Sequence, residues 1–152
     1  GAALESFGGV AGRLQRKLTA SGACVIDDTY NANPDSMRAA IDVLVSSGMA
    51  SAAVLVIGDM GEVGAQSEAL HAEVGAYAAQ RGVGALYAVG PLSAAAVNAY
   101  QTKGGGEARH FATQEDLALA LKSNLGDGAV VLVKGSRSSR MENVVNALVE
   151  KV

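Results

Sequence analysis

A polar loop near residue 30 carries the side chains best suited to binding a ligand. A carboxylate (Asp28), an aromatic ring (Tyr30) and two amides (Asn31 and Asn33) occur within residues 27–33. A carboxylate accepts hydrogen bonds from hydroxyl groups such as those of a ribose, and a tyrosine ring offers a flat face to a purine. These residues therefore suit a nucleoside. Asp and Asn also satisfy backbone groups in tight turns, and the residue types alone leave both interpretations open.

The carboxylate pair Asp27-Asp28 invites comparison with the acid–base dyads of hydrolases. Adjacent residues at the end of a strand point to opposite faces of the sheet. The two groups therefore cannot share a proton, and we expect no catalytic residue in this pair.

A second polar loop, residues 58–64, lies between a predicted strand and a predicted helix. A dinucleotide-binding fingerprint requires a glycine at its third position, where this loop has Met60. The acidic residues Asp59 and Glu62 would repel phosphates, but either could bind a substrate ammonium group. The alternative is that they close the loop and cap a helix.

A third polar loop, with Lys134, Ser136 and Arg137, follows the most hydrophobic predicted strand. Two cations beside the start of a helix suit an anion, and arginine binds carboxylates through two parallel hydrogen bonds. The pattern predicts a site for a small molecule with a free carboxylate. A positively charged surface loop is the alternative. The chain has no G-x-x-x-x-G-K-[ST] sequence, so Lys134 is not a P-loop lysine.

Apolar runs of strand length alternate along the chain with segments of helical periodicity. About six strands are predicted, at 14–18, 23–26, 53–57, 85–89, 109–111 and 129–133. The first forms a hairpin with the second and must run antiparallel to it. The alternation predicts a doubly wound, three-layer α/β sandwich of the Rossmann-like class, with a mostly parallel sheet. Ligands of such folds bind where strands end and helices begin, which is where all three polar loops lie.

The composition indicates a single domain with a packed core. Of 152 residues, 49% are hydrophobic and 18% are charged, which excludes a disordered or fibrous chain. A net charge of −3 argues against nucleic acid as a partner, and the apolar runs are too short to cross a membrane. The single cysteine, Cys24, suits a reducing compartment. We expect a cytoplasmic monomer without a metal site of its own, in which His71 and His110 are structural or solvated.

Three motifs together resemble the C-terminal domain of the Mur ligase family. They are residues 27–37 (DDTYNANPDSM), 58–64 (GDMGEVG) and 134–142 (KGSRSSRME). The resemblance implies that ATP is bound by the first motif and by a hinge-proximal arginine: Arg13, Asp28, Tyr30, Asn31 and Asn33. It implies that the other two motifs bind the dipeptide D-Ala-D-Ala: Asp59, Glu62, Lys134, Ser136 and Arg137. An ordinary surface arginine remains the alternative for Arg13.

The resemblance covers one domain of a larger enzyme. It implies that residues 1–152 lack an N-terminal UDP-substrate domain and a central ATPase domain, and that the latter holds Mg²⁺. The whole enzyme would use ATP to join D-Ala-D-Ala to UDP-N-acetylmuramoyl-tripeptide, and this chain alone would be inactive. The alternative is a stand-alone nucleotide-sensing or flavodoxin-like binding module, which would bind its ligand tightly.

Overall fold

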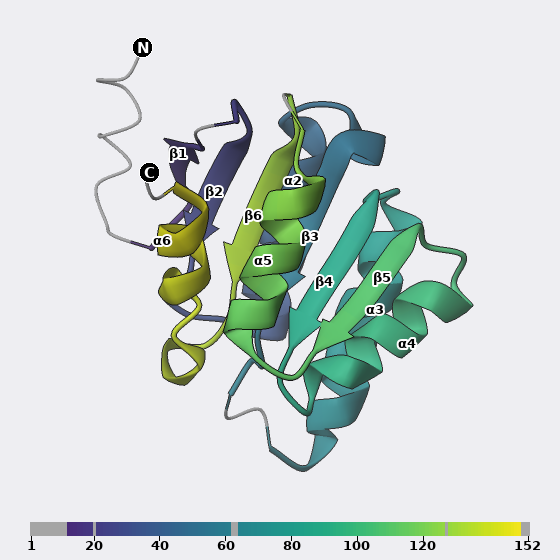
Figure 1. Ribbon diagram of the computed structural model, residues 1–152. Coiled ribbons are helices and arrows are strands. Elements are labelled where there is room, and N and C mark those ends of the chain that lie inside the picture. Colours follow the sequence, from purple (N-terminus) through teal and green to yellow (C-terminus); the bar gives the residue numbers. More distant parts are fainter. Residues whose placement is uncertain (1–11, 20, 62–63, 127, 150–152) are drawn as a thin grey trace.

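The computed structural model describes residues 12–19, 21–61, 64–126 and 128–149 (Figure 1). Its six strands are β1 (Gln15–Leu18), β2 (Cys24–Asp28), β3 (Ala53–Ile57), β4 (Ala85–Val89), β5 (Glu107–Phe111) and β6 (Val130–Lys134). Its helices are α2 (Pro34–Ser46), α3 (Ser67–Gln80), α4 (Ser93–Thr102), α5 (Gln114–Asn124) and α6 (Glu142–Val149). Three short 3₁₀ turns complete it: η2 (Ala50–Ala52), η3 (Gly64–Gln66) and η4 (Arg137–Ser139).

The strands form one sheet in the order β1-β2-β6-β3-β4-β5. Only the β1–β2 pair is antiparallel, and every other neighbouring pair is parallel. Helices α2, α3 and α4 pack on one face, and α5 and α6 pack on the other, nearer face in Figure 1. The predicted three-layer α/β sandwich with one antiparallel strand is therefore confirmed.

Strand β6 lies at the centre of the sheet because both of its faces are apolar. Leu132 contributes to the core beneath α2, while Val131 and Val133 contribute to the core beneath α5 and α6. All five residues of β6 are buried. A continuous apolar run of this kind is typical of a parallel strand covered on both sides.

The chain changes direction at the carboxyl ends of β2 and β6. Asp28 at the end of β2 is in register with Lys134 at the end of β6. The chain after β2 crosses to α2 on one face, whereas the chain after β6 crosses to α6 on the other. Because the two loops diverge, a crevice opens between them, and open α/β sheets bind their ligands at such a switch point.

Candidate functional site

The crevice contains a cavity of about 380 Å³ at the carboxyl ends of β2 and β6. All five residues that the sequence suggests for ATP line it: Arg13, Asp28, Tyr30, Asn31 and Asn33. Lys134, which we grouped with the dipeptide residues, lines the same cavity. Tertiary structure thus joins the end of β6 to the loop after β2.

Asp28 is a buried residue whose side chain is 11% exposed, and its carboxylate is held at both oxygens. Its Oδ2 lies 2.8 Å from Lys134 Nζ, and its Oδ1 accepts a hydrogen bond of 3.2 Å from the Leu14 backbone N–H. Lys134 Nζ also donates to the Asn31 carbonyl oxygen, at 2.8 Å. Since an ionised carboxylate has about four acceptor positions, each Asp28 oxygen can accept one further bond from a ligand.

The Tyr30 ring lies close to two guanidinium groups. The Arg13 guanidinium carbon is 4.0 Å from the ring centroid, and that of Arg137 is 5.0 Å away. Both distances permit an attractive cation–π interaction. Arg137, another residue grouped with the dipeptide, therefore also lies beside the nucleotide candidates.

The start of α2 fixes the end of the loop after β2. Asn33 Oδ1 accepts a hydrogen bond of 2.8 Å from the Ser36 backbone N–H, and Ser36 Oγ accepts one of 3.0 Å from the Asn33 N–H. This reciprocal capping box, with Pro34 at the first helical turn, is a strong helix start. Asn33 therefore caps the helix through its side-chain oxygen, and the cap leaves its side-chain N–H groups unused.

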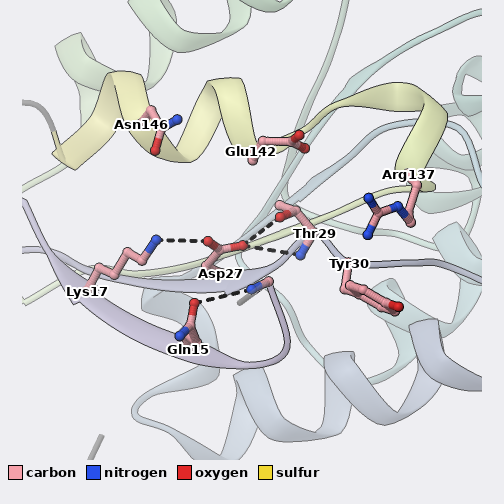
Figure 2. Close-up of a pocket in the computed structure, with 9 residues that line it drawn as sticks. Gln15, Lys17, Asp27, Thr29, Tyr30, Arg137, Glu142 and Asn146 are labelled. Carbon is pink, nitrogen blue, oxygen red and sulfur yellow. Dashed lines mark hydrogen bonds and ion pairs between the residues drawn. The ribbon is translucent and has the colours of Figure 1, made fainter. Parts of the chain in front are cut away.

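Asp27 points to the other face of the sheet, as predicted, into a cavity of about 290 Å³ shown in Figure 2. There its Oδ2 pairs with Lys17 Nζ at 3.0 Å, and its Oδ1 accepts the Thr29 hydroxyl at 2.7 Å. In Figure 2, Arg137 and Tyr30 lie at the opposite end of this cavity from Lys17. The two aspartates thus have separate partners and separate environments.

Asp59 caps a helix that is distant in the sequence. Its carboxylate accepts three hydrogen bonds at the start of α4, from the backbone N–H groups of Leu92 and Ser93 and from the Ser93 hydroxyl, at 2.8–3.2 Å. These bonds agree with the alternative interpretation of Asp59 as a helix cap. The capped helix is α4, however, and not α3, which follows the loop in the sequence. Three of the roughly four acceptor positions of this carboxylate are therefore used within the protein.

Ser136 joins the loop after β6 to the loop after β3. Its backbone N–H donates to the Asp59 carbonyl oxygen at 3.0 Å, and its hydroxyl lies 2.9 Å and 3.0 Å from those of Ser138 and Ser139. The three hydroxyls form a polar cluster in the loop after β6. Glu62, the remaining dipeptide candidate, lies outside the described residues.

His71 is a buried polar residue whose contact the sequence did not predict. Its Nε2 accepts a hydrogen bond of 2.9 Å from the Met60 backbone N–H, so Nδ1 carries the proton and donates to the Ser67 carbonyl. The side chain is 0% exposed and ties the loop after β3 to α3. Its spacing of three and seven from the buried Val74 and Ala78 was the signal that it faces the core.

Together, the fold and the crevice define a doubly wound α/β domain with its polar residues gathered at the switch point of the sheet. The pattern "Mur ligase, glutamate ligase domain" matches residues 12–137. The chain belongs to the Mur ligase family, in which it corresponds to the C-terminal domain.

The relatives of the chain point to one branch of that family. It is 42% identical over 151 residues to the UDP-N-acetylmuramoyl-tripeptide--D-alanyl-D-alanine ligase of Escherichia coli (strain K12), a match that covers 98% of this chain and 32% of that protein. A crystal structure of MurF from Acinetobacter baumannii superposes with a TM-score of 0.78 at 35% identity, covering 94% of this chain and 31% of that one. MurF ligase from Thermotoga maritima in complex with ADP gives a TM-score of 0.76 at 26% identity, covering 91% and 30%.

The chain spans about a third of the length of the curated relatives it matches. In the part of the chain that the structure describes, no helix is both long enough and apolar enough to cross a membrane.

Proposed function

We propose that this chain is the nucleotide- and dipeptide-binding domain of an ATP-dependent ligase that joins D-Ala-D-Ala to UDP-N-acetylmuramoyl-tripeptide. The observation that carries the proposal is the cavity at the switch point, which brings together Arg13, Tyr30 and the carboxylate of Asp28. A relative of known structure, MurF from Thermotoga maritima, was crystallised with ADP. The relatives that this chain matches over most of its length are named as ligases of this reaction.

In this proposal the residues of the cavity bind and orient ATP. Asp28 accepts hydrogen bonds from the ribose hydroxyls, and the adenine stacks against Tyr30 or against a guanidinium beside it. The cations Arg13 and Arg137 attract the phosphates. These contacts position the nucleotide and exclude water when this domain closes over the rest of the enzyme.

The dipeptide is proposed to bind next to this site, at the loop after β6. The hydroxyl cluster of Ser136, Ser138 and Ser139 supplies donors and acceptors for a small peptide. Asp59 acts there through its backbone carbonyl oxygen, which accepts from Ser136 and from Ser139 Oγ.

Mg²⁺ is assigned to a domain outside this chain. Among the described residues, no three His, Cys, Asp or Glu side chains gather in a group that could hold a metal ion. Asp28, the carboxylate nearest the proposed nucleotide, is already paired with Lys134. The described residues therefore do not fit the ion. Because the chain also lacks a P-loop, we propose that it has no ligase activity alone.

The test is a titration of the chain with ADP in which NMR monitors the backbone amide chemical shifts. A closing domain by itself binds ADP weakly, at millimolar concentration, with shifts around Tyr30 and Asn31. A hydrogen bond to a charged group contributes about 1.5–3 kcal/mol, so Asp28→Asn weakens ADP binding roughly tenfold or more. Asp27→Asn is the matched control, since it alters the neighbouring carboxylate on the opposite face and leaves the affinity unchanged.

Two results would decide against the proposal. Equal weakening by Asp27→Asn and Asp28→Asn would show that the loss is general and that the cavity does not bind the ribose. Tight binding of ADP, at micromolar concentration or below, would favour the second candidate, a stand-alone nucleotide-sensing module.

A further inference from the structure

The ion pair between Lys134 and Asp28 is almost completely removed from water. The two side chains are 4% and 11% exposed, and their atoms approach to 2.8 Å. Burying two charges costs several kcal/mol in desolvation, and apolar residues of similar size are often as stable or more so. A role in ligand binding therefore explains a buried ion pair at the mouth of a ligand cavity better than a contribution to stability does.

The pair fixes the geometry of the loop after β2 from a residue that is distant in sequence. Lys134 Nζ donates both to Asp28 Oδ2 and to the Asn31 carbonyl oxygen. It thus sets the plane of the carboxylate and the path of the backbone three residues further on. Lys134 also lines the cavity, and these two bonds leave the third N–H of its ammonium group unused.

The other oxygen of Asp28 is held by a residue in an unusual conformation. Leu14 has a φ of +52°, and its backbone N–H donates to Asp28 Oδ1. A residue with a branched side chain in this region carries strain on the order of 1 kcal/mol, which persists only where its surroundings impose it. The carboxylate is therefore restrained from two sides, with one acceptor position open on each oxygen.

We propose that Lys134 is the positioning residue of the nucleotide site, which orients the Asp28 carboxylate so that its two oxygens meet the two ribose hydroxyls. The proposal rests on the proposed function of the cavity. It differs from the carboxylate-binding role that the sequence suggested for Lys134, because two of the three Nζ donors already have partners within the protein.

The test compares ADP with 2′,3′-dideoxy-ADP, which lacks both hydroxyls. The unsubstituted chain should bind ADP at least about tenfold more tightly than the dideoxy compound, because even one hydroxyl–carboxylate bond contributes about 1.5 kcal/mol. In Lys134→Met, the ratio of the two affinities should fall to within about twofold, because the carboxylate loses its orientation. A merely structural defect would weaken both nucleotides alike and leave the ratio unchanged.

Lys17→Met is the matched control. Lys17 forms the equivalent ion pair with Asp27 on the opposite face, at 3.0 Å, and the same chemical change there should leave the tenfold ratio intact. The amide spectrum of each variant reports whether it is folded. If Lys134→Met does not fold, Lys134→Arg replaces it: a guanidinium keeps the charge but not the two contacts of the ammonium group, so the ratio should again fall.

The outcomes separate the two proposals. Full discrimination in a folded Lys134 variant would overturn the role of Lys134 and leave the proposed function standing. Equal affinity of the unsubstituted chain for the two nucleotides, or no binding of either, would overturn the ribose contact and both proposals with it.

Discussion

The hydrogen bonds of Asp59 lead to a prediction about stability. Helix α4 has Leu92 at its N-cap position, and Leu92 has no side-chain oxygen to bond the free N–H groups. Asp59 supplies that oxygen from the end of β3, and it also accepts from the hydroxyl of Ser93, a residue that is 0% exposed. The substitution Asp59→Ala therefore removes both the cap of α4 and the hydrogen-bond partner of the Ser93 hydroxyl.

The expected loss follows from these contacts. A missing cap costs about 1 kcal/mol, and buried donors left without a partner cost roughly 1–3 kcal/mol. We therefore expect Asp59→Ala to lower the free energy of unfolding by about 2–4 kcal/mol. For a domain of this size, the melting temperature should fall by roughly 5–12 °C. Asp59→Asn keeps an acceptor and loses only the charge at the helix start, so about 0.5–1 kcal/mol is expected.

Urea unfolding followed by circular dichroism measures these values. Gly90→Ala should also destabilise the domain, both because its φ of +110° is strained for alanine and because its Cβ would lie 2.5 Å from Asp59 Oδ1. Asp35→Ala, in the first turn of the locally capped helix α2, serves as a surface control and should cost about 0.5 kcal/mol. A loss below about 1 kcal/mol in Asp59→Ala would refute the reasoning, since it would mean that the capping bonds contribute little.

Two further substitutions test other parts of the fold. Burial raises the pKa of Tyr100, whose hydroxyl donates to the Val83 carbonyl and accepts from the Gly106 N–H. The Tyr100 hydroxyl therefore ionises at a lower pH in the unfolded chain than in the folded domain. As a result, stability is lost as the pH rises above about 10. Tyr100→Phe should make the loss of stability above about pH 10 less steep in thermal melts, and an unchanged slope would contradict this account. Gly75→Ala should lower the free energy of unfolding by about 3 kcal/mol or more, because its methyl group would overlap the Ala96 carbonyl oxygen and force α3 and α4 apart. Urea unfolding measures this loss, and a loss near zero would show that the two helices separate easily.

Local patterns in the sequence were enough to predict the architecture. Apolar runs such as 129–133, bounded by turn residues, predicted buried strands, and the helical spacing of the segments between them predicted the crossovers. The start of α2 was equally local, because Asn33, Pro34 and Ser36 form their cap within four residues. Parallel strands place their carboxyl ends at one edge, so the sequence alone also placed the polar loops together.

Only the tertiary structure decided which polar residues meet. From the sequence, Lys134, Arg137 and Asp59 were all assigned to the dipeptide, because the charges of each loop were considered separately from those of the other loops. In the fold, β6 inserts between β2 and β3, and this strand order brings Lys134 to Asp28, 106 positions away in the chain. Asp59 meets the start of α4, 34 positions away, because β3 pairs with β4 and the loops after these two strands therefore lie side by side. Periodicity and turn chemistry act over a few residues, whereas the partners of a buried charge are set by strand order, which no local pattern encodes.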